Sequence, residues 1–338
     1  MKAIVAKRYG PPAVLALRDL PAPTLQAGQV VVRVAAAGVN FADLLMRLGL
    51  YQHSPRPPFT PGLEASGTIE AVGAGVPSSR VGERVLALTQ KGSYSEKLLV
   101  RAEQAIAIPP TMSFEDAAAL PVNYLTAYHA LIYMAHLRPG ERLLIHAAAG
   151  GVGLAAIELA KMVGADIFAT ASAAKHDFLR ARGAAHTIDY HREDFEATVR
   201  ARTHSRGVDV VLDAVGGESF RKSYRLLAPA GRLIVYGLSD AVRRKRRSLR
   251  SLLALLHTPR FHPLHLIAKN RAVIGVHLGT LGRANPALVR DQLNELFRLY
   301  AGGKIKPYVG KTFPLAEAAA AHHFLHDRKN LGKVLLLP

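Results

Sequence analysis

The sequence predicts an α/β protein with two domains, a small β-barrel-like domain and a doubly wound parallel sheet. In the first ~120 residues, short alternating apolar runs are separated by Gly and Pro, as in small all-β domains. From residue 142 onward, apolar strand-like runs alternate with helical segments, which is the pattern of a parallel sheet. The length of 338 residues also exceeds the roughly 250–300 residues at which a single core stops growing.

The β-rich part shows its strands through alternating apolar residues between turn signals such as Pro57-Pro58 and Pro61-Gly62. The expected strands are residues 30–34, 65–72, 83–88 and 97–101. Ser113, followed by Glu115 and Asp116 and then an alanine run, indicates a helix N-cap with acids in the first turn.

The second part alternates strands and helices. Strands are expected at 142–147, 166–171, 186–190, 208–215, 232–236 and 273–276, and helices at 154–163, 174–182, 194–203 and 219–227. A longer amphipathic helix is expected at 286–300, ending before Gly302-Gly303. The strand-like residues 333–337 are expected to pack back on the first domain.

Composition limits the chemistry. The chain has no cysteine, which excludes disulfides, thiolate metal sites and a catalytic thiol. The N-terminus lacks the apolar core of a secretory signal, and no apolar run reaches the ~18–20 residues that span a bilayer. We therefore expect a soluble cytoplasmic protein.

The net charge of +19 raises the possibility of an anionic partner. The segment 240–270 holds eight Lys or Arg and one Asp, so it carries +7 of the total. Within it, residues 243–256 could form a cationic amphipathic helix on an anionic membrane, since the leucines at 249, 252, 253 and 256 share one helical face. The favoured alternative is an insertion with solvated arginines, whose leucines pack on the body or on a dimer partner. Nucleic acid is not expected as the partner, because only Phe261 is available nearby for base stacking.

The stretch 142–157, RLLIHAAAGGVGLAAI, has the order strand, glycine turn, helix. Aligned to the dinucleotide fingerprint G-x-G-x-x-G, Gly150 and Gly153 match the second and third glycines, whereas Ala148 occupies the first position. The helix that follows would offer free N–H groups to a pyrophosphate. The alternative is a strand-to-helix corner without a ligand.

The next strand end selects between the two nicotinamide cofactors. NAD sites place an acid there to accept from the ribose 2′-OH, but residues 170–176 contain none. Ser172 and Lys175 could instead hold a 2′-phosphate, with Tyr190 reaching it from the third strand end. The residues therefore predict NADPH, unless Lys175 is an ordinary solvated lysine.

Segments along essentially the whole chain resemble the zinc-independent quinone oxidoreductase branch of the medium-chain dehydrogenase/reductase superfamily. They are NFAD at 40–43, RLGLY at 47–51, PGLEASG at 61–67, NYLTAY at 123–128, HAAAGGVG at 146–153 and VGG at 215–217. Within that branch, residues 270–279 and 329–338 are most similar to the synaptic-vesicle membrane protein homologues of quinone oxidoreductase.

The resemblance implies a GroES-like catalytic domain of residues 1–122 and 304–338. It also implies a Rossmann NADPH-binding domain of residues 123–303, with the basic insertion 240–270, and a homodimer. The residues that it assigns to the cofactor are Asn40, Thr126, Gly150, Gly151, Val152, Gly153, Ser172, Lys175, Tyr190, Tyr236, Leu278 and Asn330.

Zinc-dependent members of the superfamily use cysteines and a Gly-His-Glu segment as zinc ligands, whereas this chain has Gly62-Leu63-Glu64 and no cysteine. No metal is therefore expected, and the substrate would be a small hydrophobic quinone or α,β-unsaturated carbonyl whose conjugation spreads the incoming charge. Tyr51, Asn40 and Asn123 are the candidate catalytic hydrogen-bond donors. His322, His323 and His326 are expected to face solvent, because no third metal ligand accompanies them.

The function expected from these residues is NADPH-dependent hydride transfer to a quinone or enone. The alternative is a dinucleotide-binding regulatory or peripheral membrane protein with little reductase activity. The glycine turn is common to both interpretations.

Overall fold

The computed structural model describes residues 1–242 and 258–338. These residues form two compact units. One comprises Met1–Val122 and Phe297–Pro338, and the other comprises the described residues between them. The predicted basic helix at 243–256 lies outside the described residues.

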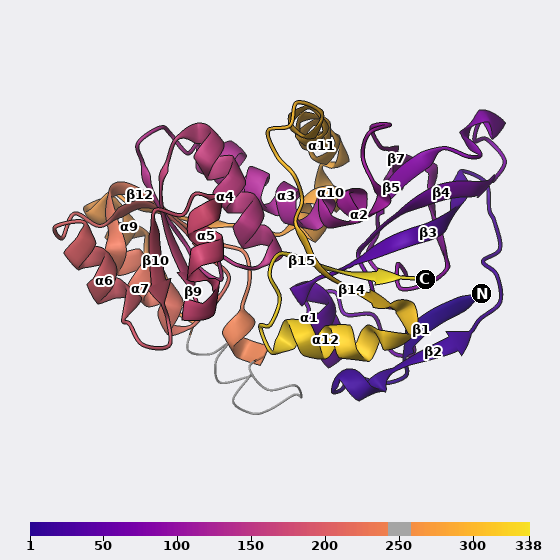
Figure 1. Cartoon of the computed structure of the whole chain (residues 1–338), viewed down its shortest axis with the longest axis horizontal. Helices are drawn as coiled ribbons and strands as arrows, with labels where there is room; N and C mark the ends of the chain where they lie inside the picture. Colours follow the sequence, from indigo (N-terminus) through magenta and orange to yellow (C-terminus); the bar gives the residue numbers. More distant parts are fainter. Residues whose placement is uncertain (243–257) are drawn as a thin grey trace. The chain divides into compact units, whose positions relative to one another are not determined.

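The first unit is built on a seven-stranded sheet (Figure 1). Its strand order is β14-β15-β3-β4-β5-β7, with β6 also paired to β3, and β1 and β2 form a separate antiparallel pair. The elements of this unit are β1 (Lys2–Ala6), β2 (Leu15–Asp19), β3 (Gln29–Val39), α1 (Phe41–Leu48), β4 (Glu64–Val72), β5 (Arg84–Leu88), β6 (Lys97–Arg101), β7 (Ala105–Ala107), α2 (Phe114–Ala119), β14 (Val309–Pro314), α12 (Ala318–His326) and β15 (Lys333–Leu337).

Strand β3 holds this sheet together because it pairs with three neighbours. Its first half pairs with β6, its last residues pair with β15, and β4 runs along its other edge. Gly67 of β4 allows the close approach, since a Cβ there would lie 2.0 Å from the Arg33 carbonyl oxygen. Strand β15 therefore packs on the first unit, as predicted.

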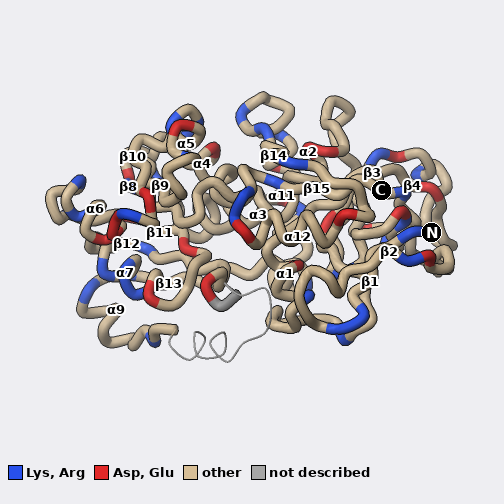
Figure 2. The backbone as a smooth tube through the Cα atoms, turned by 60° about the horizontal axis from the view of Figure 1, so that its bottom comes forward, with Lys and Arg blue, Asp and Glu red and all other residues tan. Residues whose placement is uncertain are grey.

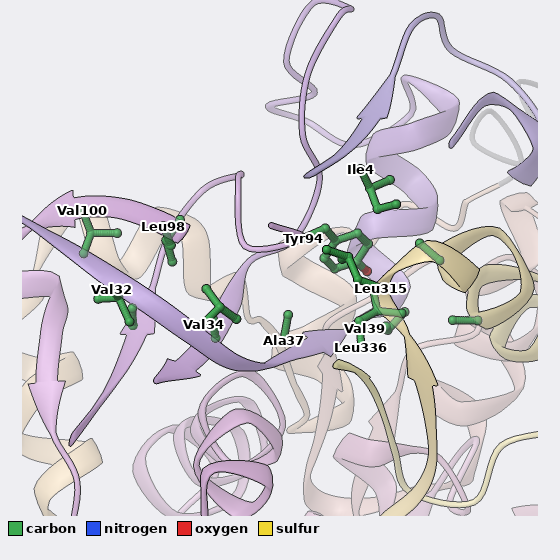
Figure 3. Packing of buried hydrophobic residues seen from close by; sticks show 14 of the residues in the cluster. Ile4, Val32, Val34, Ala37, Val39, Tyr94, Leu98, Val100, Leu315 and Leu336 are labelled. Atoms are coloured by element: carbon green, nitrogen blue, oxygen red, sulfur yellow. The ribbon is translucent and has the colours of Figure 1, made fainter. Parts of the chain in front are cut away.

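The core of this unit is apolar and draws on both ends of the chain. Figure 3 shows Ile4 and Tyr94 pointing toward Leu315 and Leu336, with Val39 beside them. All five side chains are buried. Residues from the first and last strands of the chain thus fill one core.

The second unit is a six-stranded parallel sheet flanked by helices (Figure 1). Its strand order is β10-β9-β8-β11-β12-β13, which is the doubly wound order. The strands are β8 (Arg142–Ile145), β9 (Asp166–Ala171), β10 (His186–Asp189), β11 (Val208–Asp213), β12 (Leu227–Val235) and β13 (Ala272–Gly275). The helices named with this unit are α3 (Pro121–Tyr128), α4 (Gly151–Val163), α5 (His176–Arg182), α6 (Phe195–Arg202), α7 (Glu218–Leu226), α9 (Pro263–Lys269), α10 (Leu278–Ala284) and α11 (Pro286–Ala301).

The order in which the chain adds strands to this sheet changes direction between β8 and β11. β8 continues to β9 and β10 on one side, whereas β11, β12 and β13 extend on the other. Ligands of such sheets bind at the carboxyl ends of the strands at this switch point, which is where the glycine turn leaves β8. The predicted combination of a barrel-like sheet and a doubly wound sheet is confirmed.

The positive charge of the described residues is distributed rather than concentrated. Figure 2 shows Asp and Glu interspersed with Lys and Arg along the tube. Several cations are paired, for example Arg232 with Glu141 at 2.7 Å and Arg225 with Glu196 at 2.6 Å. Among the residues described, no helix is both long enough and apolar enough to cross a membrane.

Candidate cofactor and catalytic sites

The glycine turn joins the end of β8 to the start of α4. The first N–H groups of any α-helix lack intrahelical acceptors, and Gly150, the N-cap of α4, has no side chain to accept from them. The left-handed residue of the turn is Ala147, with φ +52°, and not the neighbouring Ala148 that replaces the first glycine of the fingerprint. Ala148 is completely buried, and its N–H donates to the Thr170 carbonyl at 3.1 Å. An alanine is therefore accommodated at this position without a left-handed backbone.

Two other glycines of the turn lie where a side chain would collide. A Cβ on Gly153 would lie 2.4 Å from the Ala148 carbonyl oxygen, so the helix start packs directly on the turn. A Cβ on Gly151 would lie 2.4 Å from Nδ2 of Asn123. This bare backbone at a helix N-terminus fits a pyrophosphate, which needs close approach and unpaired N–H donors.

Asn123 and Thr126 lie on α3 and are 6% and 7% exposed. The contact between Asn123 and Gly151 brings a predicted catalytic residue to the predicted pyrophosphate turn. Both belong to the second unit, so the fold of that unit alone makes this contact.

The predicted 2′-phosphate residues follow neighbouring parallel strands. Ser172 comes directly after β9 and Lys175 ends the short 3₁₀ turn behind it, while Tyr190 comes directly after β10. All three are partly exposed. The carboxylate of Asp189, the last residue of β10, makes a hydrogen bond within its own turn, since it accepts from the N–H of His191 at 3.1 Å. Two neighbouring strand ends thus present a hydroxyl, an ammonium and a phenol.

Tyr236 and Leu278 follow the strands on the other side of the switch point. Tyr236 comes directly after β12, and Leu278 is the first residue of α10, which follows β13. Burial raises the pKa of Tyr236, and the charge of Asp213 adds to this effect. Tyr236 therefore stays protonated at neutral pH.

A buried polar network beneath the turn was not predicted from the sequence. His146 Nδ1 lies 3.1 Å from Thr170 Oγ1, and its Nε2 lies 3.1 Å from Ser223 Oγ. Ser223 in turn donates to Asp213 at 2.8 Å. Burial lowers the pKa of His146, although Asp213 opposes the shift. A neutral histidine thus joins β8, β9, β11 and α7 directly below the turn.

Asn40, Tyr51 and Asn330 lie in the first unit. The residues of the cofactor turn belong to the second unit. Asn330 donates to the Gly332 carbonyl at 3.0 Å just before β15. Tyr51 follows α1, packs partly buried on the core, and is held by Ser54, whose hydroxyl donates to the Tyr51 carbonyl at 2.9 Å.

Asn40 belongs to a second buried network that the sequence did not reveal. Its Nδ2 donates to Glu64 Oε1 at 2.7 Å, and Lys333 Nζ donates to its Oδ1 at 2.7 Å. Lys333 and Glu64 also form a direct ion pair. Glu64 and Lys333 both fall in segments that carry the family resemblance. They are 269 residues apart in sequence, so no local pattern predicts that they pair.

Asp43 and Tyr94 form a third buried group with His322. Asp43 accepts from the Asn40 N–H at 2.8 Å and from the Tyr94 hydroxyl at 3.0 Å, and the same hydroxyl lies 3.2 Å from His322 Nε2. Burial raises the pKa of Asp43 to about 7, against the lowering effect of these hydrogen bonds and of Lys333. Burial also lowers the pKa of His322 well below its ordinary value.

The expectation that the three C-terminal histidines face solvent is wrong for two of them. His322 is 0% exposed and His326 is 9% exposed, while His323 lies on the surface. Helix α12 packs this face on α1 and the core, so the residues at helical spacing turn inward. No group of three or more potential metal ligands occurs in the part of the chain that the structure describes.

Family profiles match both parts of the chain. Residues 26–110 match the alcohol dehydrogenase GroES-like domain, and residues 182–336 match a profile described as zinc-binding dehydrogenase.

Whole-chain relatives include the synaptic vesicle membrane protein VAT-1 homologs. The rat protein is 40% identical over 343 residues, covering 100% of this chain and 84% of its own length. The zebrafish protein is 42% identical over 316 residues, covering 93% of this chain and 65% of its own length. The chain thus spans somewhat less than two thirds of the zebrafish relative.

Solved structures with the same fold cover the whole chain. The human VAT-1 homolog-like protein superimposes with a TM-score of 0.86 at 33% identity and covers 100% of this chain and 98% of its own. Escherichia coli quinone oxidoreductase complexed with NADPH superimposes with a TM-score of 0.88 at 31% identity, covering 100% of both chains. The chain belongs to the quinone oxidoreductase branch of the medium-chain dehydrogenase/reductase superfamily, together with the VAT-1 homologs.

Proposed function

We propose that this protein is an NADPH-dependent oxidoreductase that reduces a quinone or an α,β-unsaturated carbonyl without zinc. The observation that carries the proposal is the bare-backbone turn at Gly151 and Gly153, next to strand ends that present Ser172, Lys175 and Tyr190. The NADPH complex of the E. coli quinone oxidoreductase, which shares the fold over the full chain, supports the choice of cofactor.

The residues of the second unit would hold the cofactor. The N–H groups at Gly151, Val152 and Gly153 would bind the pyrophosphate, and Lys175 would neutralise a 2′-phosphate that a carboxylate would repel. Thr126 would lie on the nicotinamide side, with Tyr236 and Leu278 along the remainder. A bound reduced nicotinamide supplies the hydride.

Asn40 and Tyr51 would bind and orient the acceptor, and Asn330 would contact the cofactor. Asn40 would donate to the acceptor carbonyl and thereby stabilise the negative charge that develops on its oxygen, with Asn123 as a further candidate donor. Tyr51 or solvent would supply the proton.

Zinc independence is proposed from the residues at the corresponding positions. Leu63 stands where zinc-dependent members have a histidine ligand, the chain has no cysteine, and Glu64 is paired with Lys333. Catalysis would then depend on conjugated acceptors, whose delocalised charge hydrogen-bond donors can stabilise.

We also propose a homodimer. β13 lies at the end of the parallel sheet among the described strands, so its outer backbone edge is available for pairing with a second copy. Sedimentation velocity should give a single species of twice the chain mass, and a monomer at micromolar concentration would contradict the proposal.

The competing function is a dinucleotide-binding protein with little reductase activity, which the vesicle-membrane names of the relatives favour. An NADPH oxidation assay against a panel of quinones and enones separates the two. We expect tight NADPH binding together with acceptor-dependent oxidation. Binding without oxidation of NADPH by any acceptor would support the competing function.

A further inference from the structure

A buried lysine–glutamate pair lies next to Asn40 in the first unit. Lys333 is the first residue of β15 and Glu64 the first residue of β4, with side chains 2% and 0% exposed. β15 and β4 do not pair with each other, because β3 runs between them. The two side chains therefore meet over the end of β3, where Asn40 follows Val39.

Gly38 of β3 makes room for this meeting. A Cβ at Gly38 would lie 2.5 Å from Glu64 Oε1 and 2.7 Å from Glu64 Cγ. The absent side chain thus leaves the space that the glutamate occupies. The second carboxylate oxygen of Glu64 accepts from the Val122 N–H at 2.8 Å, so both oxygens are engaged.

The side-chain amide of Asn40 is held at both of its ends. Its nitrogen faces the carboxylate of Glu64 at 2.7 Å, and its oxygen faces the ammonium of Lys333 at 2.7 Å. A flipped amide would place NH₂ against an ammonium and oxygen against a carboxylate, so the charges select one orientation. The bond to Glu64 uses one N–H of the amide, so the second N–H is the one that can donate to a ligand.

Stability alone gives little reason for such a pair. The desolvation of two buried charges offsets much of their attraction, and apolar side chains of similar volume often stabilise a fold equally well. A charged pair that hydrogen-bonds both ends of a third polar group also fixes the orientation of that group. Hydrogen bonds to charged groups are stronger and more directional than those between neutral groups.

We propose that Lys333 and Glu64 are positioning residues, which fix the Asn40 amide so that its remaining N–H donates to the carbonyl oxygen of the bound acceptor. This inference rests on the proposed reductase function. The ammonium also draws electron density toward Oδ1, which strengthens the remaining N–H as a donor.

The test uses the double variant Lys333→Met/Glu64→Gln. It leaves the net charge unchanged. After Glu64→Gln, the side-chain amide oxygen can still accept from Asn40 Nδ2. After Lys333→Met, the thioether has no proton to donate to Asn40 Oδ1. The matched control is Lys97→Met/Glu70→Gln, the same substitutions at an exposed pair of the same sheet, with side chains 33% and 38% exposed.

The first measurement needs no turnover. In ¹⁵N-labelled protein, the side-chain amide protons of Asn40 should exchange slowly with solvent. Their exchange should be about tenfold faster or more in the double variant and unchanged in the control. Rapid exchange in the wild-type protein overturns the positioning role, and this outcome can be read even if the double variant fails to fold.

The second measurement is turnover with an acceptor found in the panel. The double variant should keep NADPH affinity within about twofold and lose about 100-fold in kcat, with a smaller change in the acceptor KM. Asn40→Ala should lose a similar amount, and adding it to the double variant should cost little more, because the three residues act as one unit.

The outcomes separate this inference from the proposed function. Equal kcat in the wild-type protein and the double variant overturns the inference and leaves the reductase function intact. A wild-type protein that binds NADPH and reduces no acceptor overturns the reductase function and, with it, the catalytic purpose of the pair. In that case the amide exchange still decides whether Lys333 and Glu64 fix Asn40.

Discussion

The side chain of Asn123 lies against the backbone of Gly151, at a place where a Cβ would fall 2.4 Å from its Nδ2. Asn123 is 6% exposed, so its side chain has little room to move away from a Cβ at position 151. This contact makes one glycine of the turn responsible both for packing against α3 and for leaving the helix N-terminus bare.

Substitution Gly151→Ala should therefore weaken both stability and cofactor binding. We expect a loss of about 1–3 kcal/mol in the free energy of unfolding, and NADPH affinity lower by about tenfold or more. Urea denaturation and fluorescence titration measure the two effects. Adding Asn123→Ala should restore part of the stability by removing the clash. Gly282→Ala on α10, where a Cβ meets nothing within 4 Å, is the control. Equal behaviour of the two alanine variants would contradict the close approach.

Substitution Lys175→Ala should reduce the preference for NADPH over NADH. The lost ammonium contributes only to a 2′-phosphate, so NADPH affinity should fall by about tenfold while NADH affinity stays the same. Arg180→Ala removes an exposed cation from the same region, which is paired with Asp177, and serves as the control. Parallel losses for both cofactors would argue against a 2′-phosphate contact.

Acidity should affect stability through Asp43, whose pKa burial raises from 3.8 to about 7. Between these values the folded state binds the proton more tightly than the unfolded chain, so this carboxyl lowers stability as the pH rises from about 4 to about 7. Asp43→Asn removes the effect. The variant should gain on the wild-type protein by up to about 1.4 kcal/mol per pH unit across that range.

Urea titrations from about pH 4.5 to about pH 8 would measure this difference. Buried histidines such as His146 and His322 have lowered pKa values and therefore the opposite pH dependence, but they are present in both proteins and cancel in the comparison. A difference that does not change with pH would show that Asp43 is ionised throughout.

Substitution Tyr51→Phe tests the proton donor. The ring packs on the core and would remain in place, so NADPH affinity and thermal stability should be unchanged. A proton relay through the hydroxyl should then cost about 10–100-fold in kcat. Tyr133→Phe removes a hydroxyl from a tyrosine that is 45% exposed and is the control. An unchanged kcat would identify solvent as the source of the proton.

The sequence was a good guide wherever the signal is local. Alternating apolar residues and turn signals place β4, β6, β9 and β15 within a residue or two of their observed bounds, and Ser113 caps α2 through its bond to the Asp116 N–H. β3 is longer than predicted, because register shifts between Val31 and Val32 and between Val34 and Ala36 let it continue to pair past Val34.

What the sequence could not supply is contact between distant residues. The pairing of Lys333 with Glu64 exists because β15 and β4 flank β3, and no spacing along the chain encodes this. The burial of His322 is not predictable from the sequence either. The sequence of a histidine-rich helix is polar, and it does not show which face of the helix packs on α1. The glycine turn is predictable from the sequence, because its strand, its bare turn and its helix follow one another along the chain.

The position of β15 also sets an order of events during synthesis. This strand lies inside its sheet, between β14 and β3, and it is synthesised after the other described strands of both units. The first unit, although begun first, cannot close its sheet or bury Glu64 against an ammonium until Lys333 has emerged. The second unit, whose described residues end at Leu296, can complete its own core earlier. During synthesis, the sheet of the first unit thus stays incomplete while the second unit folds.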